Sequence, residues 1–205
     1  KLVAEAKRRG KPVTVGGPYV SSVPEEVLDA GADFVVVGEG ENTIPQFVEA
    51  LKAGKRSGVF SNGDKPDMAA SPIPRFDLLN SRHYQHGQIQ TARGCPFNCE
   101  FCDIITLYGR VPRFKPPSQV IAELESLYRL GWRGPIFVAD DNFIGNKQHA
   151  RDTLEQMIQW QESRGKPFSF FTQASVNLGQ DRELIDLLTA ARFGNIFVGV
   201  ESPDQ

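Results

Sequence analysis

The chain has 205 residues, of which 40% are hydrophobic and 23% are charged, and its formal net charge is −2. This composition is typical of a folded globular protein, and the length allows one large domain or two small ones. The small net charge gives no reason to expect a nucleic acid as a partner. No apolar run approaches the ~20 residues of a membrane-spanning helix, so no transmembrane segment is predicted.

The first quarter of the chain alternates between helical and strand patterns. Strand, glycine turn and helix follow one another twice, which is the pattern of an open α/β sheet. The predicted elements are a helix that ends at Gly10, strands at 12–15 and 33–37, and helices at about 24–30 and 43–53. The chain begins at Lys1 inside a helical pattern and stops shortly after an apolar strand, so we expect it to be part of a longer polypeptide.

A glycine-containing turn follows each of these two strands. Open α/β sheets bind ligands at the carboxyl ends of their strands, and glycine there permits close approach of the backbone. Ordinary turn chemistry explains the same residues equally well. The candidate ligand contacts are Gly16, Gly17, Pro18, Tyr19, Gly38, Glu39 and Gly40.

Residues 55–86 are rich in glycine, serine and proline and show little periodicity, so they are predicted to be a linker. From residue 87 the alternation of strands and helices resumes, which predicts a complete or partial β/α barrel with its chemistry at the carboxyl ends of the strands. The predicted strands lie at about 88–92, 135–139, 168–172 and 196–200, and the helices at about 118–130, 147–164 and 181–191.

All three cysteines of the chain follow the first of these strands, as Cys95, Cys99 and Cys102 in the spacing C-x3-C-x2-C. Three thiols cannot all pair as disulfides, and thiolates favour zinc or iron–sulfur clusters. A structural zinc ion requires a fourth ligand, which His83 or His86 would supply. Ordinary ferredoxin clusters use four cysteines. Three cysteines therefore also suit a four-iron cluster in which one iron remains free for a substrate or cofactor.

Polar residues stand where the other three predicted strands end. Carboxyl ends of parallel strands meet at one edge of a barrel, so these side chains are candidates for one site. Helix capping and turn chemistry account for such residues as well. They are Asp140, Asp141 and Asn142 after the second strand, Gln173 and Ser175 after the third, and Glu201 and Ser202 after the fourth.

The chain resembles the radical S-adenosylmethionine superfamily in the cysteine segment RGCPFNCEFCDIITLYGRVPRFK, in which Phe101 precedes the last cysteine, and in FVADDNFIGNK, FFTQASVNL and FVGVES. Within it, these segments are similar to the cobalamin-binding branch that includes the hopanoid methylases. The amino-terminal part agrees, because it resembles the last third of a cobalamin-binding domain in PVTVGGPYVSSVPEEVLDAGADFVVVGEGENTIPQFVEAL. The resemblance covers nearly the whole chain.

The resemblance implies an α/β fold in which residues 1–54 end an open Rossmann-like cobalamin-binding domain, 55–86 are a linker and 87–205 begin a radical S-adenosylmethionine barrel, truncated after its fourth strand. It implies that the three cysteines hold a 4Fe-4S cluster and that the glycine turns contact cobalamin. The segment ADDN departs from the commoner G-G-E form, which leaves open which of its polar residues contacts S-adenosylmethionine. The implied contacts with S-adenosylmethionine are Phe101, Asp140, Asp141, Asn142, Gln173, Ser175 and Glu201.

The implied activity is transfer of a methyl group to an unactivated carbon of a small or lipid-like metabolite. A reductant such as flavodoxin or ferredoxin is the implied partner, and thiolate ligands favour the reducing cytoplasm. Two alternatives remain: a cobalamin-binding cyclase or rearrangement enzyme with the same cofactors, and a zinc-stabilised binding module. The usual place of a D-x-H-x-x-G motif, which would supply a histidine to cobalt, is upstream of Lys1.

Overall fold

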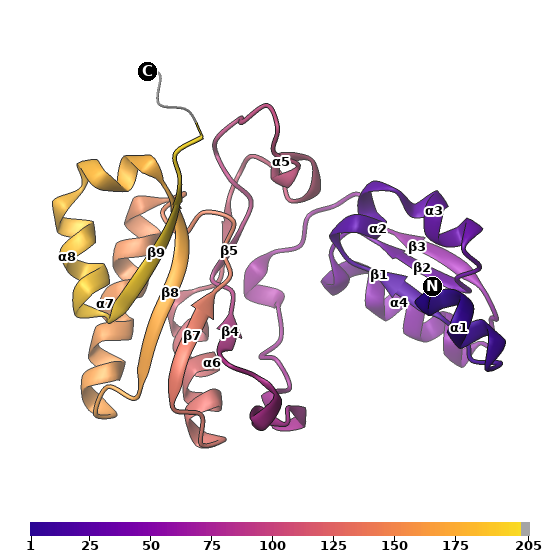
Figure 1. The fold of residues 1–205 in the computed structure, drawn as a ribbon, viewed down its shortest axis with the longest axis horizontal. Coiled ribbons are helices and arrows are strands. Elements are labelled where there is room, and N and C mark those ends of the chain that lie inside the picture. The colour runs from indigo at the N-terminus through magenta and orange to yellow at the C-terminus, as the bar shows by residue number, and fades with distance from the viewer. Residues whose placement is uncertain (202–205) are drawn as a thin grey trace. The chain divides into compact units, whose positions relative to one another are not determined.

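The computed structural model describes residues 1–201. The chain forms two compact units, and the boundary between them in the sequence lies between Ala70 and Ser71. The first unit is a parallel sheet in the order β1-β2-β3. Helices α2 and α3 lie on one face of this sheet and α4 on the other (Figure 1). The elements are α1 (Leu2–Arg8), β1 (Thr14–Gly16), α2 (Pro18–Ser22), α3 (Pro24–Asp29), β2 (Phe34–Val37), α4 (Gly40–Lys52) and β3 (Gly58–Ser61).

The central strand β2 is apolar throughout because it is covered on both faces, as a parallel strand between helices is. Phe34 on β2, Phe47 on α4 and Phe60 on β3 pack together, with the first two ring centroids 5.3 Å apart. Strand β3 lies inside residues 55–86, the stretch predicted to be a linker. The structure differs there because Phe60 supplies an apolar side chain to the core of this unit.

The second unit is built on a four-stranded parallel sheet in the order β4-β7-β8-β9. Helices α6, α7 and α8 cover one face of it (Figure 1). Its strands are β4 (Gly87–Ile89), β7 (Gly134–Val138), β8 (Phe168–Ser175) and β9 (Phe193–Gly199), and its helices are α5 (Ile104–Leu107), α6 (Pro117–Arg129), α7 (Lys147–Ser163) and α8 (Arg182–Ala190). Short 3-10 segments lie at Phe76–Leu78, Ser81–His83 and Val176–Gln180 in this unit, and at Met68–Ala70 at the end of the first unit.

The core of this unit lies between the sheet and the three helices. Alternate strand residues such as Ile136, Val138 and Phe170 are buried against apolar helix residues such as Leu124 and Leu154. The intervening strand residues therefore face the other side of the sheet. The four strands and the three intervening helices predicted for the partial barrel are thus present. Within residues 1–201, none of the helices has the length and apolar character that crossing a membrane requires.

The predicted strand at 88–92 is divided in the structure. Strand β4 ends at Ile89, and Ala92–Arg93 form β5, which pairs in the antiparallel sense with β6 (Arg113–Phe114). A long-range contact causes the division, because the backbone N–H groups of Thr91 and Ala92 donate to the carboxylate of Asp140 rather than to a neighbouring strand. The cysteines therefore lie in a loop with its own two-stranded stem.

Candidate functional site

The cysteine loop, residues 94–112, connects β5 to β6 and contains the short helix α5. It lies beyond the end of the sheet toward which β7 points (Figure 1). Cys99 is exposed, and Cys95 and Cys102 are partly exposed. The backbone N–H of Cys102 donates to the carbonyl of Cys99, with nitrogen and oxygen 3.1 Å apart. All three thiols are therefore carried by one locally folded loop at the carboxyl edge of the sheet, as predicted.

Gly94 determines the backbone direction at the start of this loop. Its φ is +94°, and a Cβ there would lie 2.9 Å from the carbonyl oxygen of Gly109 and 3.3 Å from that of Val111. A side chain at residue 94 would therefore be both strained and in collision. The close approach lets the N–H of Cys95 donate to the carbonyl of Gly109, at 3.3 Å. The two ends of the loop are joined in this way directly beside the first cysteine.

Asp140 follows β7 and is fully buried. Its carboxylate accepts hydrogen bonds from the N–H of Thr91 at 2.6 Å, from the N–H of Ala92 at 3.0 Å and from the hydroxyl of Thr91. Burial raises the pKa of Asp140 to about 6, although the hydrogen bonds from Thr91 and Ala92 act in the opposite direction. The side chain therefore fixes the strand that leads into the cysteine loop, and it has no surface for a ligand.

The neighbouring polar residues extend this attachment. The carboxylate of Asp141, which is partly exposed, accepts from the N–H of Gly94 at 2.8 Å. The side-chain amide of Gln173 donates to the backbone carbonyl of Asp140 at 3.0 Å. Gln173 lies inside β8 rather than after it. The ends of β7 and β8 are therefore bonded both to each other and to the start of the loop.

Asn142 connects the first cysteine to the end of β8. Its side-chain nitrogen lies 3.0 Å from Oγ of Ser175 and 3.9 Å from Sγ of Cys95, and its side-chain oxygen accepts from the N–H of Ser175 at 3.3 Å. The Ser175 hydroxyl donates to Asn177 at 2.6 Å. The structure thus brings three of the predicted site residues, Cys95, Asn142 and Ser175, into one hydrogen-bonded group.

Sequence reasoning missed one ion pair that supports the other end of the loop. Lys115 follows β6, and its ammonium group lies 2.5 Å from the carboxylate of Glu123 on α6; both side chains are buried. Burial raises the pKa of Glu123, against the hydrogen bond from Lys115. Among residues 1–201, no group forms a hydrogen bond with Oε2 of Glu123. The sequence did contain a signal for this pair. Glu123 lies beside the apolar stripe of Val120, Leu124 and Leu127, on the helix face that packs against the core, so a buried acid with a basic partner could have been predicted.

Two further predicted contacts lie apart from this hydrogen-bonded group. Phe101 is 69% exposed on the cysteine loop. Glu201 follows β9 with a φ of 56°, and its carboxylate occupies the space that a Cβ at Gly199 would take. Both residues lie at the expected edge of the sheet, and their contact with a ligand stays a prediction. Ser202 lies outside the described residues.

The two glycine turns of the first unit lie at the carboxyl ends of β1 and β2, which are paired strands. Gly17 has a φ of +109° and precedes α2, so that Pro18 and Tyr19 begin a helix where only a turn was predicted. Gly38 has a φ of +83° and donates its N–H to the hydroxyl of Ser21. Glycine is thus required at 17 and 38 by the backbone conformation itself.

The remaining candidates belong to α4 and to the exposed surface. Gly40 is the first residue of α4, and Glu39, which is buried, precedes it as the N-cap. Tyr19 is 62% exposed, and its hydroxyl donates to the carboxylate of Glu26, which raises the pKa of the tyrosine. The candidate cobalamin contacts therefore gather around the carboxyl ends of β1 and β2, while Glu39 contributes little exposed surface.

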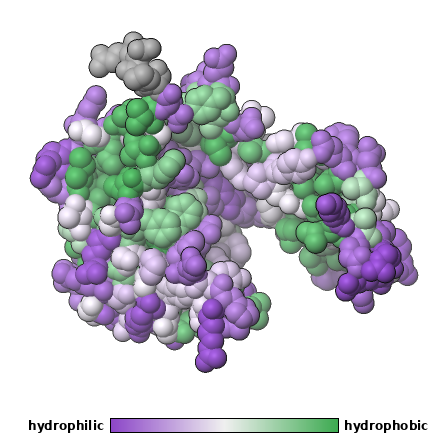
Figure 2. Space-filling view, viewed as in Figure 1, coloured by the Kyte–Doolittle hydropathy of each residue, from purple (hydrophilic) through white to green (hydrophobic). Residues whose placement is uncertain are grey.

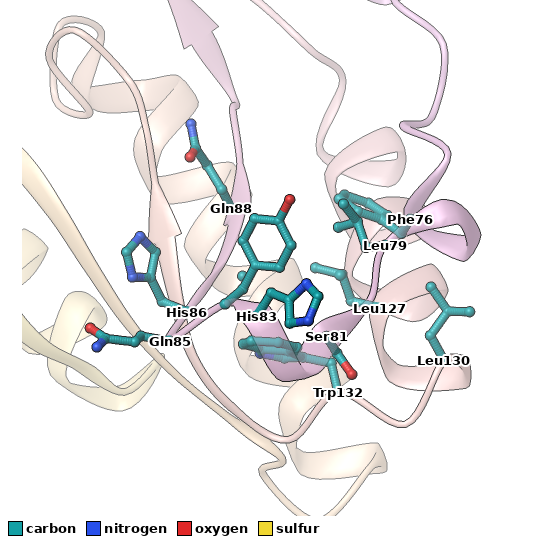
Figure 3. Close-up of a pocket in the computed structure, with 12 residues that line it drawn as sticks. Phe76, Leu79, Ser81, His83, Gln85, His86, Gln88, Leu127, Leu130 and Trp132 are labelled. Carbon is teal, nitrogen blue, oxygen red and sulfur yellow. The ribbon is translucent and has the colours of Figure 1, made fainter.

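His83 and His86 lie at the opposite end of β4 from the cysteines. The His86 ring packs 5.3 Å from the ring of Phe171, and both histidines border a cavity of about 380 Å³ with apolar walls that include Phe76 and Trp132. In Figure 3 the His86 ring points away from the apolar side chains of this cavity. The alternative in which one of these histidines completes a zinc site with the cysteines is therefore contradicted, since the whole of β4 separates them.

The described residues hold no preformed site for a single ion. Among residues 1–201, no three or more side chains of histidine, cysteine, aspartate or glutamate are grouped so that they could hold one metal ion. A zinc ion requires its ligands about 2.0–2.3 Å from one point. A four-iron cluster binds three thiolates through three different iron atoms, so its ligands need not converge on a single point. The donor set and its placement in one loop therefore fit a cluster.

Comparison with known proteins decides the family. The family model of the Radical SAM superfamily matches residues 89–205, more than half of the chain. This chain belongs to the radical SAM superfamily. The matched region begins at the last residue of β4 and includes the cysteine loop and the strands β7, β8 and β9.

Curated relatives cover both units of this radical SAM protein. It is 52% identical to an uncharacterized methyltransferase of Synechocystis, over 99% of this chain and 38% of that protein. It is 40% identical to the hopanoid C-2 methylase of Rhodopseudomonas palustris, over 94% of this chain and 37% of that enzyme. The chain therefore spans less than half the length of the curated relatives it matches.

A solved structure shows the same fold. The radical S-adenosylmethionine methyltransferase TsrM of Kitasatospora setae, with tryptophan and a SAM analog bound, matches with a TM-score of 0.79 and 20% identity, over 97% of this chain and 43% of TsrM. TsrM with cobalamin and a [4Fe-4S] cluster bound matches with a TM-score of 0.73. Both units of this chain, each with its parallel sheet, thus have counterparts in one solved protein.

Proposed function

We propose that this chain belongs to a cobalamin-dependent radical S-adenosylmethionine enzyme that methylates an unactivated carbon of a small or lipid-like metabolite. One observation carries the proposal: the three thiols lie on one loop at the carboxyl edge of a parallel sheet. Polar residues at the ends of the strands of this sheet form hydrogen bonds with the loop and with the segment that leads into it. The names of the relatives support methyl transfer, since one is a hopanoid C-2 methylase.

The three cysteines fit a 4Fe-4S cluster, which, with S-adenosylmethionine and methylcobalamin bound, would supply the electron, the radical and the methyl group of the reaction. The chain's own task is to hold the cysteine loop in position. Asp140 fixes the strand before the loop, and the buried pair of Lys115 and Glu123 fixes the strand after it. Gly94 allows the two ends of the loop to approach each other closely, beside the first cysteine.

S-adenosylmethionine would bind at the same edge of the sheet. The residues proposed for direct contact are those with exposed or partly exposed side chains there: Phe101, Asp141, Gln173, Ser175 and Glu201. Sequence reasoning left open which acidic or amide residue after β7 makes the contact. The burial of Asp140 and Asn142 favours Asp141, and the two buried residues would act by holding the others in place.

Cobalamin would bind to the first unit. The exposed residues Gly16, Gly17, Pro18 and Tyr19 lie at the end of β1 and directly after it, and Gly38 and Gly40 follow the paired strand β2. Around Gly17 no atom would lie within 4 Å of a Cβ, so a flat macrocycle can approach the backbone there. Retention of added hydroxocobalamin, followed by its visible spectrum, checks this part of the proposal.

A lipid-like substrate agrees with the apolar surface near the site. Val176, Phe197 and Val200 are 65%, 72% and 68% exposed around the carboxyl ends of β8 and β9. In Figure 2 hydrophobic residues gather at this end of the second unit. The proposal also includes an electron donor such as flavodoxin or ferredoxin, and a cytoplasmic setting, because the cysteines must stay reduced to bind iron.

The deciding experiment measures iron, sulfide and zinc, with an ultraviolet–visible spectrum, on the anaerobically reconstituted full-length protein. We expect about four irons per chain, as a 4Fe-4S cluster requires, and a band that changes when S-adenosylmethionine is added. One zinc and no visible absorption would overturn the proposal. Cys99→Ala should abolish cluster assembly. Product analysis with S-adenosylmethionine labelled in its methyl group then separates methylation from cyclisation, since only methylation leaves the label in the product.

A further inference from the structure

The orientation of the Asn142 side-chain amide is fixed by its partners. The backbone N–H of Ser175 can only donate, so the atom of Asn142 that lies 3.3 Å from it must be the oxygen. The Ser175 hydroxyl has one proton and two carbonyl oxygens within reach, that of Asn177 at 2.6 Å and that of Asn142 at 3.4 Å. The shorter contact takes the proton, so toward the Asn142 nitrogen the hydroxyl acts as an acceptor. The two ends of the amide are therefore not interchangeable, and the NH₂ group is the end that faces Cys95.

The two N–H groups of this amide have two different acceptors. One donates to Oγ of Ser175, with nitrogen and oxygen 3.0 Å apart, and the other is directed at Sγ of Cys95, with nitrogen and sulfur 3.9 Å apart. Asn142 is only 5% exposed, so water does not compete strongly for either bond. The donor to the sulfur is therefore held in place by the end of β8 as well as by the segment after β7 that carries Asn142.

We propose that Asn142 is a positioning residue that donates a hydrogen bond to the Cys95 thiolate and thereby raises the reduction potential of the cluster that Cys95 would help to hold. The inference rests on the proposed function, because it requires a cluster at the three cysteines. Hydrogen bonds to ligand sulfurs are one of the factors that set cluster potentials. The reduced cluster carries one more negative charge than the oxidised cluster, so an N–H dipole aimed at its sulfur stabilises the reduced form more.

Replacing Asn142 should therefore make the cluster harder to reduce. Asn142→Leu has nearly the same size and removes both donors. Asn142→Asp keeps the oxygen that accepts from Ser175 but presents a carboxylate to the thiolate in place of the N–H. We expect the equilibrium constant for one-electron reduction to fall about tenfold in Asn142→Leu, which is about 59 mV, and further in Asn142→Asp.

The measurement is a redox titration of the full-length, anaerobically reconstituted protein, followed by the electron paramagnetic resonance signal of the reduced cluster. Asn177→Leu is the matched control: it replaces a neighbouring amide that accepts from the Ser175 hydroxyl, and it leaves both the Asn142 amide and the Ser175 backbone N–H that orients it. Its potential should stay close to that of the unsubstituted protein. Iron and sulfide are measured on every sample, so that only proteins with equal cluster content are compared.

Each outcome has a separate meaning. Equal potentials in the unsubstituted protein and in Asn142→Leu, at equal iron content, would overturn the role of Asn142 and leave the proposed function intact. If Asn142→Leu does not hold a cluster, the comparison is made with Asn142→Asp, which keeps the bond from the Ser175 N–H. A potential in Asn142→Asp equal to that of the unsubstituted protein would overturn the role of Asn142. Failure of the unsubstituted protein to assemble a cluster would instead overturn the proposed function.

Discussion

The carboxylate of Asp140 accepts hydrogen bonds from both the backbone N–H and the hydroxyl of Thr91, a residue 49 positions earlier in the chain. Through this contact the end of β7 stops β4 from pairing further and directs the chain into the cysteine loop. A single buried side chain therefore couples the sheet of the second unit to the segment that carries the thiols.

Asp140→Ala should destabilise the protein strongly. The substitution leaves the N–H groups of Thr91 and Ala92 buried without an acceptor, and each unsatisfied group costs about 1–3 kcal/mol. We expect a loss of about 2–4 kcal/mol at pH 5, measured by urea unfolding. Asp186→Ala is the control, because Asp186 forms an exposed ion pair with Arg182 and its loss should change the free energy by no more than about 0.5 kcal/mol.

The stabilising effect of Asp140 should depend on pH. Burial raises the pKa of Asp140 to about 6 from an ordinary value of 3.8, so between these two values the folded state holds a proton that the unfolded state has released. The free energy of unfolding therefore falls as pH rises from about 4 to about 6. The difference between the unsubstituted protein and Asp140→Ala should be smaller at pH 7 than at pH 4.5. A difference that grows with pH would contradict the raised pKa.

Lys115→Met should destabilise the protein by about 3–5 kcal/mol, because it leaves the carboxylate of Glu123 buried without its counter-charge. Removing both charges, in Lys115→Met with Glu123→Leu, should restore most of this loss. Urea unfolding of the two single variants and the double variant forms a complete cycle. Simple additivity of the two single effects would show that the pair does not act as a unit.

Gly94→Ala should reduce the iron content as well as the stability. Residue 94 has a positive φ, and a Cβ there collides with the carbonyl of Gly109, which accepts from the N–H of Cys95. The matched control is Gly165→Ala, at a φ of +72° with no atom within 4 Å of the added Cβ. The control should lose about 1–2 kcal/mol from backbone strain alone and bind iron normally. Normal iron binding by Gly94→Ala would show that the loop tolerates a wider stem.

Local sequence patterns were sufficient for the elements and for the cysteine loop. The helices α6, α7 and α8 and the strands β7, β8 and β9 were predicted close to their observed positions, because each has its own apolar periodicity and a turn at its end. The three cysteines stand within eight residues of one another, so their spacing is also a local property. The family followed from this loop together with the residues after each strand.

Only the tertiary structure decided what the polar residues after the strands do. Asp140 binds Thr91, and Asn142 reaches Cys95 across 47 positions, through contacts that depend on the register of parallel strands and on which face each side chain points to. In the first unit, parallel pairing with β2 drew residues 58–61 into a sheet. Sequence periodicity determines which residues are buried within an element, whereas the pairing of distant elements determines which polar groups they meet.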